Sequence, residues 1–256
     1  MTESFTLSLA AVDILAEALG VECRRFPFQL PGIGDFVEDR VRIAQAVFAD
    51  LTRRGLVHDE RLDPDVAEAL RLMSRHRVAI AVMGTLDDES PLYARVSTDG
   101  ERGLLVTLED QMFRFEFVRP ESLARTAVSL LPRLRPGHGQ SVTITAKPAA
   151  TEEKREGFGR EVRPARTASQ AQLLAAQEML RKPRTGAGYF VVSVMDRAGR
   201  ETRAPGLSWL DTEEGRYMAQ AHPDDGGGTF APADTIRLVQ QLEDLMDSLG
   251  QSSSVS

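Results

Sequence analysis

One segment of the chain, His222-Pro223-Asp224-Asp225, combines residue types that can bind a divalent cation. An imidazole and two carboxylates close together could supply the nitrogen and oxygen ligands. Proline and aspartate are also the residues that tight turns favour, so a plain turn is the preferred interpretation. The acidic run Asp87-Asp88-Glu89 lies where a hairpin must turn, which favours a solvated loop over a metal site. A metal-dependent enzyme acting on small molecules through the His222–Asp225 turn is kept as an alternative function.

Three further segments carry residue types used in catalysis or phosphate binding, but in the wrong context. Gly137-His138-Gly139-Gln140-Ser141 resembles a nucleophile elbow, except that glycine stands where the motif needs its serine. Gly186-Ala187-Gly188 precedes a predicted strand, whereas a phosphate-binding loop follows a strand and opens a helix. Cys23 has no histidine near it in the sequence, so an inert thiol is expected. The sequence therefore predicts no catalytic residue, no metal, no cofactor and no enzyme activity.

Composition narrows the class of protein. The chain has 256 residues, of which 42% are hydrophobic and 27% charged, and these values are typical of a soluble protein with a sizeable core. The net charge of -7 argues against binding to nucleic acid or to an anionic membrane. The single cysteine excludes an intrachain disulfide and permits a reducing compartment. The N-terminus lacks the features of a signal peptide and no apolar run is long enough to span a membrane, so a cytoplasmic protein is expected.

The elements that would position any site follow an approximate internal repeat. Residues 78–134 align with residues 190–246 at an offset of 112, without a gap. Both copies predict a strand pair, an acidic turn closed by glycine (Gly103 and Gly215), another strand, and then proline (Pro120 and Pro232) with a helix. This order predicts a duplicated sheet-plus-helix unit in which proline superposes on proline. A duplicated scaffold favours a binding protein over a catalytic cleft.

Hydrophobic periodicity and turn residues define the individual elements. Phe5, Leu7 and Leu9 alternate with polar residues and predict a short strand near the N-terminus. Helices are predicted at 12–19, 37–51, 64–74 (after an Asp63 N-cap), 120–131, 170–181 and 232–249. Strands are predicted at 78–83, 92–97, 104–108, 112–118, 141–146, 189–195, 207–210 and 216–221.

Two helices have an apolar stripe at helical spacing, and the stripe of the last helix is expected to face the core. The helix that follows a predicted Asp35 N-cap has its stripe at Val37, Val41, Ala44, Phe48 and Leu51. The last helix has its stripe at Ile236, Val239, Leu242 and Met246. Leu238 and Leu245 lie off that second stripe, so they are either wedged between two layers or exposed to a partner.

The organisation along the chain follows from these elements. We expect a single domain over residues 1–249, made of two related halves at about 1–136 and 137–249. Segment 148–169 is charged, interrupted by glycine and proline, and nearly free of large apolar residues, so a mobile linker is predicted. Residues 250–256 are expected to form a disordered tail.

Several stretches, taken in order, resemble the EspG family, the cytosolic chaperones of mycobacterial type VII (ESX) secretion. The chain is more similar to the broader actinobacterial branch of that family than to its mycobacterial members. The resemblance covers nearly the whole chain outside the linker and the tail. It is carried by FTLS at 5–8, Phe26-Pro27-Phe28, Glu38-Asp39-Arg40, Arg54-Gly55-Leu56, Gly186-Ala187-Gly188-Tyr189-Phe190, Leu207-Ser208-Trp209-Leu210-Asp211-Thr212, Gly215-Arg216-Tyr217 and Pro232-Ala233-Asp234.

The resemblance implies an α+β fold of two quasi-symmetric halves, with a central antiparallel β-sheet flanked by helical bundles. It also implies a cytoplasmic, non-enzymatic chaperone that keeps a helical export substrate, PE–PPE-like or WXG100-like, soluble before export. Family members bind through the sheet and the C-terminal helical bundle. Neither nucleic acid binding nor membrane insertion is expected. A homodimeric scaffold, in which the sheet face seals itself against a second copy, is a further alternative.

The surface expected to bind the partner combines one face of the sheet with the last helix. In strand 112–118 the three phenylalanines share one face and the polar residues share the other, so one face is packed and one is wet. Strand aromatics such as Trp209 are either core residues or anchors for a partner, because tryptophan and tyrosine concentrate interface energy. If the off-stripe leucines are core residues, the hairpin loop around 86–93 takes their place. The candidate contact residues are Leu86, Tyr93, Met112, Arg114, Glu116, Trp209, Tyr217, Leu238 and Leu245.

Overall fold

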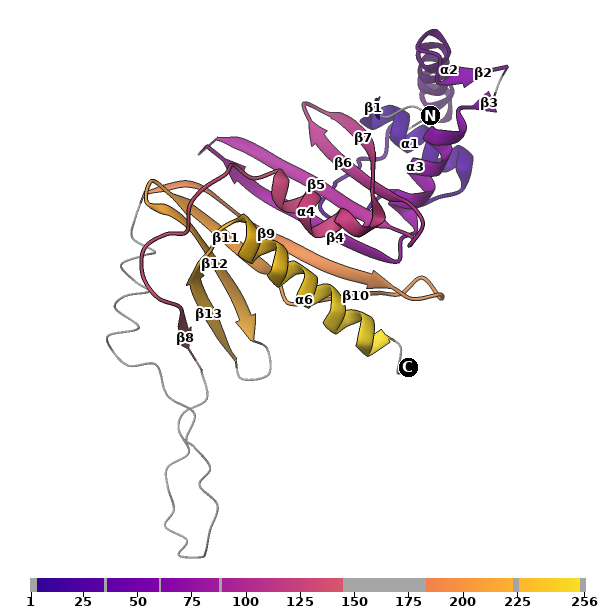
Figure 1. The fold of residues 1–256 in the computed structure, drawn as a ribbon. Helices are drawn as coiled ribbons and strands as arrows, with labels where there is room; N and C mark the ends of the chain where they lie inside the picture. The colour runs from indigo at the N-terminus through magenta and orange to yellow at the C-terminus, as the bar shows by residue number, and fades with distance from the viewer. Residues whose placement is uncertain are drawn as a thin grey trace, which may run out of the picture.

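The computed structural model describes residues 4–34, 36–59, 61–87, 89–144, 183–222 and 226–253. The predicted linker 148–169, the predicted helix 170–181 and residues 223–225 lie outside the described residues. The helices are α1 (Leu9–Leu19), α2 (Val37–Arg53), α3 (Pro64–Ser74), the 3-10 turn η1 (Pro120–Ser122), α4 (Leu123–Ser129) and α6 (Thr235–Ser253). The strands are β1 (Ser4–Ser8), β2 (Val57–His58), β3 (Arg61–Leu62), β4 (Val78–Leu86), β5 (Ser90–Thr98), β6 (Gly103–Glu109), β7 (Met112–Val118), β8 (Val142–Ile144), β9 (Arg184–Met195), β10 (Glu201–Arg203), β11 (Leu207–Thr212), β12 (Gly215–His222) and β13 (Gly227–Pro232) (Figure 1).

One large antiparallel sheet organises the fold. Its strands lie in the order β1-β7-β6-β5-β4-β9-β11-β12-β13-β8, and β10 pairs with β9 outside this path. The first strands of the two repeats, β4 and β9, pair with each other at the centre. From there β5, β6 and β7 follow outward on one side, and β11, β12 and β13 follow outward on the other. The two halves are therefore related by an approximate two-fold axis, which confirms the predicted α+β fold of quasi-symmetric halves.

The repeat holds for the order of the strands but not for every turn. Gly103 and Gly215 each begin the strand that follows the acidic turn, as predicted. That turn comprises residues 99–102 in the first half and only residues 213 and 214 in the second. Pro232 lies within β13 opposite Tyr217, whereas Pro120 lies beyond the end of β7. The expected superposition of the two prolines is therefore wrong, because turns of unequal length shift the ladders.

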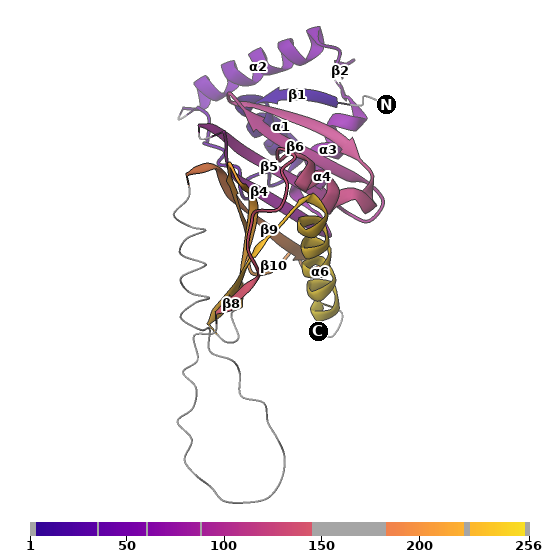
Figure 2. The same ribbon diagram turned by 60° about the vertical axis from the view of Figure 1, so that its left-hand side comes forward.

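Helices cover the two faces of the sheet in different places. On one face α4 and α6 pack over the centre of the sheet, and Ile80 and Phe190 contribute to the core below them (Figure 1). On the other face α1 and α3 pack over the outer strands of the first half, where Phe113 and Phe115 are fully buried. We call these the α6 face and the α1 face. Figure 2 shows α2 beside β1, at the end of the molecule opposite the C-terminus.

Side-chain caps set the boundaries of two helices. The Ser8 hydroxyl accepts a hydrogen bond from the backbone N–H of Ala11 at 3.1 Å, which is the geometry of an N-cap. Leu9 therefore begins α1, and its prediction as a strand residue is wrong. Gly20 ends α1 in the left-handed region, at φ 65°, where glycine is unstrained. Asp63 caps α3 as predicted.

Two other helix ends differ from the prediction. The helix α2 begins at Val37, and Phe36 occupies its N-cap position without a side-chain hydrogen bond. The predicted cap, Asp35, lies outside the described residues. At the other end of the chain α6 continues to Ser253, beyond the expected end at Leu249. Part of the predicted tail is therefore helical.

Candidate partner-binding surface

Trp209 on β11 lies in the core under α6. Its side chain is 2% exposed, and its ring centroid lies 4.8 Å from that of Phe190. A Cβ atom at Gly188 would lie 2.3 Å from the indole, and one at Gly84 would lie 2.8 Å from it, so both glycines make room for the ring. Trp209 is therefore a core residue, the first of the two interpretations of the strand aromatics, and it also contributes to the lining of the hollow described below.

Tyr217 on β12 is also fully buried. Its hydroxyl donates a hydrogen bond to the carbonyl oxygen of His138 at 3.1 Å. The neighbouring Arg216 is 0% exposed and holds both carboxylate oxygens of Asp211, at 2.6 and 2.7 Å. Arg216 also donates to the carbonyl of Pro132 at 2.9 Å. This network fixes the connection 132–139 across β12, so Tyr217 stabilises the crossover between the halves and is unavailable to a partner.

The leucines of α6 that lay off the predicted stripe form its core-facing side. Leu238 is 0% exposed and Leu245 is 6% exposed. Ile236, which the prediction placed inside, is 75% exposed. The buried positions are spaced by four, three and four residues, at Leu238, Leu242, Leu245 and Leu249. Leu238 and Leu245 are therefore corrected from contact residues to core residues.

The polar side of β7 is open, as the alternation predicted. Met112 is 38% exposed, and the side chains of Arg114 and Glu116 are 61% and 44% exposed. Arg114 and Glu116 face each other at 4.0 Å, which is a weak surface pair. Only β1, which pairs with β7, lies between β7 and the edge of the sheet. The polar strip therefore lies near the edge of the α6 face. These three residues remain available to a partner.

The β4–β5 hairpin places the remaining two candidates near its tip. Leu86 pairs with Ser90, and the turn between them includes Asp87 in the left-handed region at φ 47°. Leu86 is half-buried and packs against the core under α6. Tyr93 is half-buried against the core of the α1 face. The two side chains therefore lie on opposite faces of the same hairpin.

A hollow on the α1 face of the second half was not predicted. It has a volume of about 480 Å³ and lies over β4, β9, β11, β12 and β13. The small apolar cluster beside it contains no helical residue among those described. No sequence pattern marks it, because its lining combines small side chains such as Ala187, Ser208 and Ala219 with large ones from separate strands. Its lining includes Met83, Ala187, Tyr189, Ser208, Leu210, Ala219 and Phe230.

Among the residues that the structure describes, the candidates for metal and thiol chemistry do not assemble a site. The Cys23 side chain is 2% exposed, and burial, aided by the charge of Glu22, raises the pKa of its thiol to about 12. His222 lies 3.3 Å from the hydroxyl of Thr229, while the acidic part of its turn is outside the described ranges. Within those ranges no group of three or more histidine, cysteine, aspartate and glutamate residues could hold a metal ion. No helix in the same ranges is long and apolar enough to cross a membrane.

Comparison with known proteins agrees with this architecture. A model of the EspG family matches residues 8–244. The chain belongs to the EspG family. It is also similar to a solved structure of the Mycobacterium tuberculosis type VII secretion system chaperone EspG5 in complex with the PE25–PPE41 dimer. That match has a TM-score of 0.64 at 11% sequence identity and covers 95% of this chain and 96% of that one. No curated protein matches the chain significantly.

In this EspG-family chain a buried polar cluster joins the two halves under the α1 face. Arg95 on β5 is 2% exposed and donates hydrogen bonds to the carbonyl of Phe26 at 2.7 Å and to Oε1 of Glu201 at 3.2 Å. Its third contact is Nε2 of His76, at 3.0 Å. Glu201 lies on β10 in the second half, so the cluster ties strands that are far apart in the sequence.

The charges of this cluster are fixed near neutral pH. Burial and the nearby charge of Arg95 lower the pKa of His76 to about 3, so its ring is neutral and accepts through Nε2. Burial lowers the pKa of Arg95 to about 10. Burial acts to raise the pKa of Glu201, but the Ser193 hydroxyl and two arginines outweigh it and lower that pKa to about 2. No member titrates near pH 7, so the cluster is structural and not an acid–base site.

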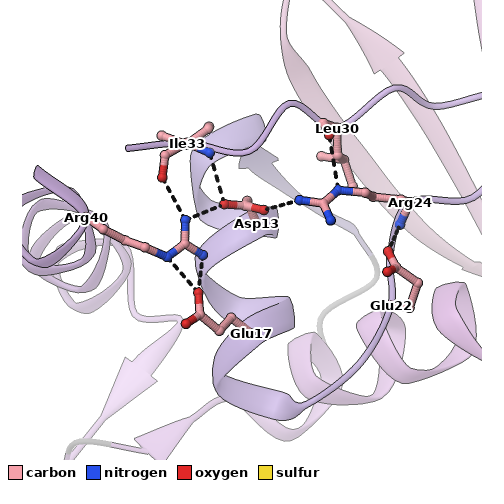
Figure 3. A network of polar contacts seen from close by, with 7 residues as sticks. All are labelled: Asp13, Glu17, Glu22, Arg24, Leu30, Ile33 and Arg40. Atoms are coloured by element: carbon pink, nitrogen blue, oxygen red, sulfur yellow. Dashed lines mark hydrogen bonds and ion pairs between the residues drawn. The ribbon is translucent and has the colours of Figure 1, made fainter. Parts of the chain in front are cut away.

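A second polar network in the EspG-family chain holds α2 against α1 (Figure 3). Asp13 on α1 is 8% exposed and accepts a hydrogen bond from Arg40 of α2 at 2.8 Å. Arg40 also donates to the carbonyl of Ile33 at 2.7 Å and pairs with Glu17. Hydrogen bonds to Asp13 and Glu17 raise the pKa of Arg40. No pattern in the sequence predicts this network, because its members come from three separate segments.

Proposed function

We propose that this EspG-family chain is a chaperone of a type VII secretion system. It binds a helical export substrate, PE–PPE-like or WXG100-like, and keeps it soluble in the cytoplasm before export. The match of the family model to residues 8–244 supports this role. The solved EspG5 complex, which holds a PE25–PPE41 dimer, makes a PE–PPE-like pair the first partner to test. The fold is proposed to act as one domain of two halves, at about 1–136 and 137–249.

The substrate is proposed to bind the hollow on the α1 face together with the tip of the β4–β5 hairpin. The hollow is the single observation that carries this assignment, because it offers an apolar surface over several strands of one sheet. Met83 of β4 lines the hollow, and the same strand leads into the hairpin tip at Leu86. The polar strip Met112, Arg114 and Glu116 lies on the opposite face and serves as an outer contact for a large substrate.

No chemistry is needed for this role. Shielding an apolar tip from water requires surface area, and the hydrophobic effect supplies the driving force. The buried thiol and the neutral, buried imidazole of the described core are suited to packing and not to catalysis. A non-enzymatic function is therefore the proposal that fits the surface.

Co-expression with a tagged PE–PPE-like pair or a WXG100-like protein, encoded beside this gene, tests the proposal. Ser208 is exposed and lines the hollow, so Ser208→Arg fills the surface without removing a core contact. The substrate should co-purify with the wild-type chain and be lost with Ser208→Arg. Thr202→Arg, at an exposed position of β10 outside the hollow, is the matched control and should retain the substrate. Equal capture by both variants would contradict the assignment of the hollow.

A further inference from the structure

One wall of the hollow on the α1 face is the aromatic ring of Tyr189. Directly paired residues of β9, β11, β12 and β13 cross the hollow in one row, in the order Tyr189, Ser208, Ala219 and Phe230. The two small residues in the middle form a low floor, because side chains of directly paired residues point to the same face of a sheet. The position of the Tyr189 ring therefore limits the hollow on the side that faces the centre of the sheet.

The Tyr189 ring is supported by the loop that connects α1 to α2. The Phe26 ring of this loop stacks on it, with the ring centroids 6.2 Å apart and the planes 18° from parallel. The Tyr189 hydroxyl donates to Sδ of Met83 at 3.6 Å, so the ring is also held at its polar end. Phe26 is half-buried and does not line the hollow itself. The wall is thus assembled from segments that are far apart in the sequence.

Two arginines hold Phe26, one by its backbone and one by its ring. Arg95 on β5 donates to the Phe26 carbonyl at 2.7 Å. The guanidinium of Arg203 on β10 lies 5.7 Å from the centroid of the Phe26 ring, which is a cation–π contact. Phe26 therefore connects the wall of the hollow to β10.

Glu201 joins the two arginines to each other. Its Oε1 atom accepts from Arg95 at 3.2 Å, and its Oε2 atom accepts from Arg203 at 3.1 Å. The side chains of Glu201 and Arg95 are 14% and 2% exposed, whereas that of Arg203 is 52% exposed. Arg203 is therefore the one member of this network that can be substituted without opening the core.

The stability of the fold does not account for the placement of Arg203. A half-exposed ion pair contributes little to stability, because water screens it and the side chain loses rotamer freedom. The same side chain restricts the Phe26 ring, and through it the Tyr189 ring. A wall that is fixed before a partner arrives loses less conformational entropy on binding, which strengthens the complex.

We propose that Phe26 and Arg203 are positioning residues of the hollow, which hold the Tyr189 ring in place before the export substrate binds. The consequence for binding rests on the proposed function, whereas the positioning of the ring can be measured on the chain alone. The loop between α1 and α2 then takes part in substrate binding although it does not line the hollow.

Fluorine NMR tests the positioning without a substrate. The chain has three tyrosines, so labelling with 3-fluorotyrosine gives three resonances, and Tyr189→Phe identifies that of Tyr189. Arg203→Met should shift this resonance, because the ring current of Phe26 acts on a less ordered neighbour, and Phe26→Leu should shift it further. The matched control is Arg200→Met, which removes the same charge from an exposed arginine that pairs with Asp196 outside this network. A Tyr189 resonance that is identical in Arg203→Met and the wild type overturns the proposal.

Binding of the PE–PPE-like pair encoded beside this gene tests the consequence. Its dissociation constant should rise about tenfold for Arg203→Met, since a cation–π contact of ordinary strength no longer restrains the wall. Arg203→Lys keeps a cation above the ring and should recover most of this loss. Arg200→Met should bind as the wild type does, and all three variants should keep the wild-type melting temperature.

The outcomes separate this inference from the proposed function. Equal affinity of Arg203→Met and the wild type, or equal losses with Arg203→Met and Arg200→Met, would show that the stack does not position the wall for binding. If the wild-type chain captures no such pair and no WXG100-like protein, the proposed function fails. The fluorine spectra then decide by themselves whether Arg203 and Phe26 position the Tyr189 ring.

Discussion

Ile80 on β4 and Val192 on β9 are paired directly across the centre of the sheet, and they lie 112 positions apart in the sequence. This separation equals the offset of the internal repeat. The pairing therefore brings together two positions that the repeat makes equivalent. Both side chains are fully buried under α4 and α6. Two equivalent positions of the faint repeat thus meet in one buried pair.

Replacing Ile80 with alanine should destabilise both halves together. The change removes buried methyl and methylene groups and leaves a cavity at the centre of the sheet, so a loss of about 2–5 kcal/mol is expected. Urea unfolding followed by circular dichroism measures the free energy. The control Met112→Ala, at a half-open position of β7, should change the free energy by no more than about 0.5 kcal/mol. Two separate transitions in the variant would show that the halves unfold independently.

The same substitution at two positions on α6 should lower the stability of the fold by very different amounts. Leu238 is fully buried, so Leu238→Ser should cost about 3 kcal/mol or more, because it creates a cavity and buries a hydroxyl. Ile236 is 75% exposed two residues away, so Ile236→Ser should cost less than about 0.5 kcal/mol. Thermal melts of both variants measure the difference. Equal melting temperatures would contradict the observed orientation of α6.

The buried and exposed faces of a strand or helix could be predicted from the sequence where only one apolar pattern was present. In β7 the phenylalanines alternate strictly with polar residues, so the packed and wet faces could be assigned correctly. In α6 two interleaved apolar stripes were present, one through Ile236 and one through Leu238. Periodicity alone could not separate them, because the choice depends on how the helix is rotated against the sheet.

Other features depended on contacts between distant segments. The stripe of α2 has helical spacing throughout, but nothing in its spacing shows that the core ends near Leu51. Trp209 is buried because Gly84 and Gly188 leave space for its indole, and they come from two other strands. The hollow is lined by residues of five strands that are separated in the sequence. That the two halves contain the same succession of strands was predictable from the repeat, whereas these packing details required the three-dimensional arrangement.

The crossover between the halves should be sensitive to a single methyl group. A Cβ atom at Gly137 would lie 2.1 Å from Cζ of Tyr217, so Gly137→Ala cannot be accommodated without displacing the ring or the connection. A loss of about 1–3 kcal/mol in the free energy of unfolding is expected from such overpacking. Gly250→Ala, where nothing lies within 4 Å, is the control and should be neutral or slightly stabilising in its helix. Urea titrations of the two variants decide whether the connection is tightly packed.

Tyr217→Phe isolates the hydrogen bond of the same crossover. The change keeps the ring and removes the hydroxyl that donates to the carbonyl of His138. A loss of about 1 kcal/mol is expected, since the carbonyl loses its partner while the packing is retained. Amide hydrogen exchange in residues 132–139 should speed up in this variant, and unchanged protection would show that the hydroxyl does not hold the connection.

Acid stability should depend on His76. The fold lowers the pKa of this histidine from 6.5 to about 3, so the unfolded chain binds a proton that the folded chain does not. Its contribution is therefore fully present above about pH 6.5 and is lost as the pH falls from there towards 3. In this window a single such proton gives a slope of about 1.4 kcal/mol per pH unit.

The variant His76→Gln keeps an acceptor for Arg95 but does not titrate, so its free energy of unfolding should fall less steeply between pH 6 and pH 4. Urea unfolding at several pH values measures both slopes. Parallel slopes for wild type and variant would mean that the His76 ring is not held neutral in the folded chain.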